Sequence, residues 1–154
     1  IVGRTTDSSY APKLSLAGVP VILGYTTQNA ISLHVDLAFT DKTYYSPNIY
    51  PIGQQVLNTT HPITRILTTN TFDAYKNVTT EFISVLDSTG NVVGTPLIKS
   101  TGHSLTTNYS MTAHTTEIGT RYVFMGFLYR TVSDTTKVLL DRAIKWVAKK
   151  DHLL

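Results

Sequence analysis

The order of hydrophobic and polar positions along the chain predicts several strands. Residues 19–25 read Val-Pro-Val-Ile-Leu-Gly-Tyr, a short, nearly continuous apolar run that is typical of a strand buried on both faces. Residues 121–128 form a second run of this kind, and residues 1–3 resemble the end of a third strand. Residues 81–86 and 92–98 flank the sequence Asp-Ser-Thr-Gly, which predicts a β-hairpin.

The C-terminal part of the chain predicts an amphipathic helix. Its apolar residues recur at three- and four-residue spacing, at Leu139, Leu140, Ala143, Ile144 and Val147. Ser133 or Asp134 is the expected cap at the start of this helix. Lys145, Lys149 and Lys150 mark its solvent-facing side and, near the helix end, complement the helix dipole.

Three other segments carry weaker patterns. Residues 40–60 contain Pro47, Pro51 and Gly53 and predict a long loop, and residues 100–116 are polar and loop-like. Residues 31–39 alternate like a strand but follow a strand and a turn, which favours a helix, so both assignments stay open. Buried strands followed by a terminal amphipathic helix together predict an α/β sheet covered by helices.

Several separated pieces of the chain also carry a family resemblance. They are residues 18–28 (Gly-Val-Pro-Val-Ile-Leu-Gly-Tyr-Thr-Thr-Gln), 61–64 (His-Pro-Ile-Thr), 121–127, and 139–147 (Leu-Leu-Asp-Arg-Ala-Ile-Lys-Trp-Val). In this order they resemble the class I glutamine amidotransferase-like superfamily, particularly its trehalose-utilisation-like relatives that are not amidotransferases. The resemblance implies a flavodoxin-like, amidotransferase-like domain with a mixed, mainly parallel sheet flanked by helices and a C-terminal amphipathic helix.

The departures from this family pattern predict a catalytically silent domain. The resemblance implies a cysteine nucleophile at the turn after residues 18–25, where Thr26 stands, and a His and a Glu after the late strand, where residues 126–131 have neither. The opening is also short, because the strand and helix that would precede residues 1–3 are missing. We therefore expect a single domain over residues 1–154 that is a fragment of a larger chain, a domain that a neighbouring chain completes, or a trimmed variant of the fold.

Composition and charge exclude several classes of protein. The 154 residues contain no cysteine and no run of 18 apolar residues, so we expect no disulfide scaffold, no cysteine-bound metal and no membrane span. The net charge of +3 and a charged fraction of 15% are too small for a nucleic-acid-binding stripe. No metal site and no other cofactor is predicted, because the chain has no HExxH motif and no paired carboxylates.

The predicted ligand-binding residues follow the expected strands, where open α/β sheets bind ligands. They are Asp7, Ser8, Ser9, Tyr25, Thr26, Gln28 and His61. A hydroxyl-rich pocket with a tyrosine as stacking face suits a neutral, sugar-like ligand. The same Ser, Asp and Thr residues are also common as caps of helices and turns, and this structural interpretation is the favoured one. His103, His114 and Glu117 share a polar segment and form a second, weaker candidate cluster.

Three tyrosines and three sequons bear on partners and compartment. Tyr44, Tyr45 and Tyr50 lie in the predicted loop and suit either self-association and contacts within a parent assembly, or a lid over the core. The N-glycosylation sequons begin at Asn58, Asn77 and Asn108, close to the number expected by chance. Sequons and the hydroxyl-rich composition together favour an extracellular, cell-surface or virion location.

These observations lead to one main functional hypothesis and two alternatives. The main hypothesis is a binding or structural module of a larger surface, secreted or virion assembly, without catalytic residues. The first alternative is a hydrolase for a carbohydrate-related small substrate that uses Asp7, Thr26 and either His61 or His103. The second is a virus structural protein without a ligand.

Overall fold

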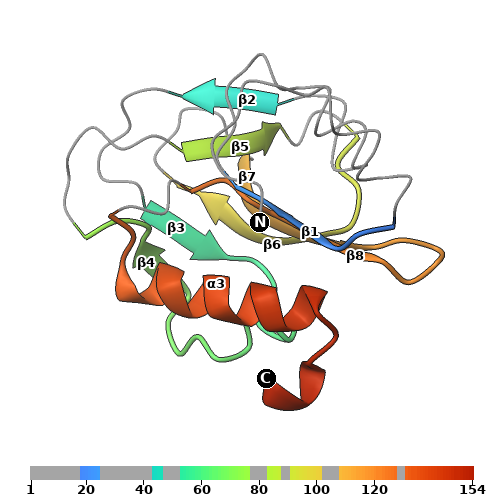
Figure 1. Ribbon diagram of the computed structural model, residues 1–154. Helices are drawn as coiled ribbons and strands as arrows, with labels where there is room; N and C mark the ends of the chain where they lie inside the picture. The colour runs from blue at the N-terminus through green and yellow to red at the C-terminus, as the bar shows by residue number, and fades with distance from the viewer. Residues whose placement is uncertain are drawn as a thin grey trace.

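The computed structural model describes residues 18–24, 43–46, 53–76, 83–87, 91–101, 108–127 and 131–154. Within these residues, the regular structure consists of eight strands of one sheet, a long helix and a short 3₁₀ helix (Figure 1). The strands are β1 Val21–Leu23, β2 Thr43–Ser46, β3 Gly53–Val56, β4 Thr71–Asp73, β5 Ile83–Asp87, β6 Thr95–Ser100, β7 Asn108–Thr115 and β8 Arg121–Met125. Helix α3 spans Asp134–Val147, and the 3₁₀ helix η2 spans Asp151–Leu153.

The sheet is mixed but mostly antiparallel. Its main path has the order β1-β8-β7-β6-β3-β4, while β5 pairs with β7 and with β2. Among the described strands only β1 and β8 are parallel, with Ile22 opposite Val123. The predicted flavodoxin-like, mainly parallel sheet flanked by helices is therefore wrong. Parallel neighbours need a crossover of a dozen or more residues, whereas residues 116–120 that join β7 to β8 allow only a tight antiparallel turn.

The predicted apolar strands and the C-terminal helix are present. Residues 21–23 and 121–125 form β1 and β8, and every residue of β1 is buried. Helix α3 begins at the predicted cap, because the Ser133 side chain accepts a hydrogen bond from the backbone N–H of Thr136 at 3.2 Å. The helix contacts β1 and β8 and covers one face of the sheet (Figure 1).

The buried side of α3 differs in part from the predicted one. Leu139 and Ala143 are fully buried, as the spacing predicts, but Ile144 is 41% exposed. Arg142 takes a buried position instead and is 7% exposed. At this position Arg142 donates hydrogen bonds to the carbonyls of Pro62 and Ile63 in the turn after β3.

The predicted hairpin between residues 81–86 and 92–98 does not form. Strand β5 pairs with β2 and β7, and β6 pairs with β3 and β7, so β5 and β6 are not neighbours. A turn sequence favours a local reversal, but the choice of strand partner depends on which side chains are buried together across the sheet.

The two segments predicted as loops contain strands. Within residues 40–60, β2 pairs with β5 and β3 pairs with β4 and β6. Within residues 100–116, β7 pairs with β5, β6 and β8. Hydroxyl side chains misled the prediction here, since threonine is a good strand former and a buried serine can be satisfied by hydrogen bonding. The Ser110 hydroxyl in β7 donates to the Oε1 of Gln54 in β3. Residues 1–3 and 31–39 lie outside the described part of the chain.

The sheet divides at Gly126. Strand β8 pairs with one part of β7, at Met111–Thr115, and β5 pairs with the part that precedes it, at Asn108 and Tyr109. Between the two, the N–H of Gly126 donates to the Ser110 carbonyl at 3.0 Å and its own carbonyl accepts from the N–H of Ser84 at 2.8 Å. A Cβ atom at Gly126 would lie 1.9 Å from the Ser84 carbonyl oxygen, so a residue with a side chain does not fit.

The core lies between α3 and the sheet. Its members from the strands include Ile22, Val123 and Met125, and α3 contributes Leu139 and Trp146. No helix within the described residues is long and apolar enough to cross a membrane.

Candidate functional site

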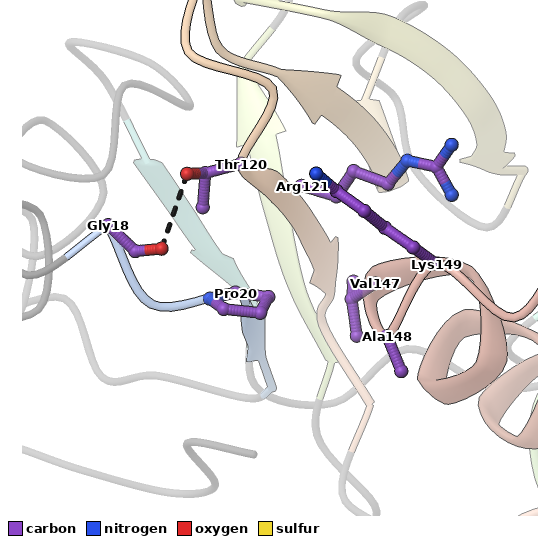
Figure 2. Close-up of a pocket in the computed structure, with 7 residues that line it drawn as sticks. All are labelled: Gly18, Pro20, Thr120, Arg121, Val147, Ala148 and Lys149. Atoms are coloured by element: carbon purple, nitrogen blue, oxygen red, sulfur yellow. Dashed lines mark hydrogen bonds between the residues drawn. The ribbon is translucent and has the colours of Figure 1, made fainter.

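A groove of about 230 Å³ lies where the beginnings of β1 and β8 meet the end of α3 (Figure 2). Its lining consists of Gly18, Pro20, Thr120, Arg121, Val147, Ala148 and Lys149. Pro20, Val147 and Ala148 form an apolar wall. The Thr120 hydroxyl donates to the Gly18 carbonyl at 3.2 Å, which ties the segment before β1 to the start of β8. The groove thus combines apolar surface with two cationic side chains.

Lys149 has an unusual backbone conformation for a lysine. The N–H of Lys150 donates to the Lys145 carbonyl at 2.8 Å, and the N–H of Lys149 donates to the Trp146 carbonyl at 3.0 Å. These are the two hydrogen bonds of a Schellman motif, which places a left-handed residue directly after the helix. Glycine usually occupies that position, but here it is Lys149, with a φ of 56°. Lys149 is the one non-glycine residue in the described segments with a positive φ.

The lysine side chain reaches across the groove towards the β7–β8 turn (Figure 2). Its Nζ lies 3.6 Å from the position that a Cβ atom would take at Gly119. Two other cations at this end of the molecule have partners, since Arg121 pairs with Asp151 at 2.6 Å and Lys145 with Asp141 at 2.6 Å. Among the described residues, no acidic side chain forms an ion pair with Lys149.

Apolar side chains extend the groove at its rim. Ile118, in the β7–β8 turn, is 81% exposed, and Val19, next to the groove residues Gly18 and Pro20, is 44% exposed. The Cδ1 atom of Ile118 lies 3.7 Å from the position of a Cβ atom at Gly18, so the turn lies against the segment before β1. An exposed apolar rim beside a groove is typical of a contact surface.

Behind the groove, Arg121 is held in a network of aromatic and charged groups. Its guanidinium lies 4.8 Å from the ring centroid of Trp146 and also donates to the Trp146 carbonyl at 2.8 Å. Its two terminal nitrogens both donate to Asp151, and this hydrogen bonding holds the pKa of the Asp151 carboxyl below its usual range. Arg121 therefore stabilises the end of α3, and Lys149 is the more available of the two groove cations.

His61, one of the predicted ligand-binding residues, also lies against Trp146. The two rings are 5.2 Å apart between centroids. The Nδ1 of His61 accepts a hydrogen bond from the Ile63 N–H at 3.2 Å, which leaves the proton of the neutral ring on Nε2. Burial, with a further contribution from the nearby Arg121 charge, lowers the pKa of His61 to about 4. His61 is thus neutral at pH 7, and its contacts are those of a structural residue.

The lowered pKa predicts a pH dependence of stability. Between pH 6.5 and about 4 the unfolded chain binds a proton at His61 and the folded chain does not, so the free energy of unfolding falls as pH falls. Because the ring is only half-buried, we expect a contribution on the order of 1–2 kcal/mol. His61→Asn keeps an acceptor for the Ile63 N–H but does not titrate. Urea unfolding across this pH range should give a flatter profile for His61→Asn, and identical slopes would contradict the assignment.

The other residues predicted to bind a ligand cannot be compared with the structure. Asp7, Ser8, Ser9, Tyr25, Thr26 and Gln28 lie outside the described residues, as does His103. The pocket for a neutral, sugar-like ligand that these residues were expected to form stays a prediction.

The structure describes part of two further candidate groups. Tyr44 and Tyr45 belong to strand β2, opposite Val85 and Ser84 of β5, and Tyr50 lies outside the described residues. His114 lies in β7 and Glu117 in the turn after it. Across the described segments, no group of three or more His, Asp or Glu residues could hold a metal ion.

Two further hollows are less suited to binding. One, of about 300 Å³, is lined by Gly53, Gln54, Thr71, Phe72, Asp73 and Thr101. The amide of Gln54 is already engaged there, because it accepts from Ser110 and donates to the Gly53 carbonyl. The other, of about 330 Å³, lies beside the start of α3, where the carboxylate of Asp134 pairs with Lys76 and Lys137.

The sequence pattern singled out Lys149, together with Lys145 and Lys150, but assigned it to the helix dipole. One sequence feature could have indicated the site: a lysine stands at the position after the helix, where glycine is usual. Gly18 and Thr120, which are joined by a hydrogen bond, are separated by 102 residues of the chain, so their proximity has no local signal.

Comparisons with protein-family models, with curated proteins and with solved structures find no match to this chain. They therefore do not bear on the resemblance to the amidotransferase-like superfamily, whose implied fold the sheet topology contradicts.

Proposed function

We propose that this chain is a non-catalytic binding module of a larger surface, secreted or virion assembly, and that it docks an acidic, apolar segment of a partner protein in the groove at the end of α3. The observation that carries this proposal is the left-handed backbone conformation of Lys149. A lysine in a left-handed conformation costs stability that a glycine at the same position would not. Such local strain is typical of sites under a functional requirement.

The chemistry of the groove favours this class of partner. Pro20, Val147 and Ala148 suit an aliphatic side chain, and the exposed Ile118 extends the apolar surface. The Lys149 ammonium suits a neighbouring carboxylate, and none of the described residues that line the groove is acidic.

The replacement Lys149→Gly should improve folding and weaken binding at the same time. We expect the free energy of unfolding to rise by about 0.5–1 kcal/mol, because glycine adopts a φ of 56° without strain. We expect the affinity for the peptide acetyl-Leu-Asp-Leu-Asp-Leu-amide to fall about fivefold, as for the loss of one exposed charge pair. Urea unfolding and calorimetric titration measure the two effects.

Matched controls separate the groove from net charge. Lys150→Ala removes the same charge one residue away and should change the affinity much less. The neutral peptide acetyl-Leu-Asn-Leu-Asn-Leu-amide should bind the natural protein as weakly as the acidic peptide binds Lys149→Gly. Equal affinity of both peptides, or equal effects of the two lysine replacements, would rule out recognition of the carboxylate by Lys149.

A further inference from the structure

The structure separates two of the three sequons by accessibility. Asn108 lies within β7, where it is opposite both Ser100 and Asp87, and it is 1% exposed. Its Nδ2 is buried, and so is Ser110, the third residue of that sequon. A glycan at Asn108 is therefore incompatible with the fold. Asn77 lies outside the described residues.

Asn58 has the opposite environment. It lies in the turn that follows β3, it is only partly buried, and the next two residues of its sequon, Thr59 and Thr60, are exposed. Its Oδ1 accepts hydrogen bonds from the N–H of Thr60 at 2.9 Å, from the Thr60 hydroxyl at 3.0 Å and from the N–H of His61 at 2.9 Å. These bonds fix the amide through its oxygen alone, and Nδ2 takes part in none of them.

The attachment of a glycan would leave these contacts intact. N-glycosylation converts the primary amide into a secondary amide, and the oxygen keeps its ability to accept hydrogen bonds. The three bonds to Oδ1 therefore persist after modification. The turn can carry a bulky polar group without loss of the interactions that hold it.

We propose that Asn58 is an N-glycosylation site of this protein and that Asn108 is not. In the transfer, Nδ2 forms a bond to the anomeric carbon of a polyprenyl-diphosphate-linked oligosaccharide. The bond from that carbon to the diphosphate oxygen breaks, the polyprenyl diphosphate leaves, and Nδ2 loses one proton. The Thr60 hydroxyl, which donates to Oδ1, is the hydroxyl that the sequon requires.

A glycan at Asn58 has a consequence for the protein surface. Leu57, the residue before it, is 42% exposed, and the glycan would cover this apolar side chain. None of the residues that line the groove belongs to this turn. A partner would then be directed away from the turn after β3.

The experiment is secretion of the full chain from a eukaryotic cell in an Asn77→Gln background, which removes the sequon that the structure does not describe. Digestion with peptide-N-glycosidase converts each glycosylated asparagine into aspartate, and peptide mass spectrometry then identifies the site. We expect conversion at Asn58 and none at Asn108. Thr60→Ala should abolish the modification, whereas Thr59→Ala, at the unrestricted middle position, should preserve it.

Two results would overturn the proposal: folded, secreted protein without a glycan at Asn58, or folded protein with a glycan at Asn108. If a variant is not exported, translation into microsomes supplies the same test without a need for secretion. A gel shift that Thr60→Ala loses and Thr59→Ala retains supports modification at Asn58. A shift that is identical in both variants, or absent from the natural sequence, contradicts it.

Discussion

Replacement of Gly126 by alanine is expected to destabilise the protein by more than about 4 kcal/mol or to prevent folding. Gly126 lies at the point where the strand that pairs with β7 changes from β8 to β5. A Cβ atom there would lie 1.9 Å from the carbonyl oxygen of Ser84 and 2.8 Å from its carbonyl carbon. These are backbone atoms, so relief of the clash requires that β5 move away from Gly126, which breaks the hydrogen bond from the Ser84 N–H to the Gly126 carbonyl.

Gly119→Ala is the matched control for this experiment. Gly119 has a φ of 80°. A Cβ atom there would lie 3.6 Å from the Nζ of the flexible Lys149 side chain. Alanine there is strained but does not clash, so we expect a cost of about 1–2 kcal/mol. Urea unfolding monitored by circular dichroism compares the two variants. Similar losses in both would mean that the division of the sheet at Gly126 tolerates a side chain.

Replacement of Arg142 by methionine is expected to lower the free energy of unfolding by about 2–4 kcal/mol. The Arg142 Nε donates to the Ile63 carbonyl at 2.8 Å and to the Pro62 carbonyl at 3.1 Å, and Nη2 donates to Pro62 and to Leu154. Methionine keeps the apolar stem but leaves these carbonyls without their donor. The loss should loosen the turn after β3 from α3.

Lys137→Met provides the control on the exposed face of the same helix. Lys137 is solvent-exposed and pairs with Asp134 at 3.3 Å, so its replacement should change stability by no more than about 0.5 kcal/mol. Thermal unfolding of the two variants measures the difference. Equal melting temperatures for Arg142→Met and the natural protein would show that the buried guanidinium contributes specificity rather than stability.

Local patterns predicted the elements whose partners are local. Ser133 and the apolar spacing at Leu139 and Ala143 predicted α3, because a helix is stabilised by a capping group and by one apolar face that both lie within a few residues. The apolar runs that became β1 and β8 were recognised for a similar reason, since a strand buried on both faces has few polar positions.

Polar segments were harder to interpret. Strand β7 looked like a loop because Asn108, Ser110 and Thr112 are polar, although all three are buried. Ser110 is satisfied by a side chain 56 residues earlier in the chain, and no local pattern contains that partner. The prediction of the fold class was wrong for the same reason. Four of the antiparallel pairings of the sheet involve β6 or β7.

The candidate site shows the same division. The sequence indicated that Lys149 belongs to a cationic helix end, but its left-handed backbone is seen only in the Schellman motif of the folded chain. Likewise, the sequence identified sequons at Asn58 and Asn108, and only the pairing of β7 decided that one is accessible and the other buried.

The sequence by itself determined the C-terminal helix, its cap and the two most apolar strands, because each depends on residues that are neighbours along the chain. The tertiary structure alone decided the partners of β7, the requirement for glycine at position 126 and the burial of Arg142. It also brought Gly18, Thr120 and Lys149 together in one groove. These features depend on atoms that folding brings into contact from distant segments, and burial, steric exclusion and hydrogen bonding act on those contacts only once they exist.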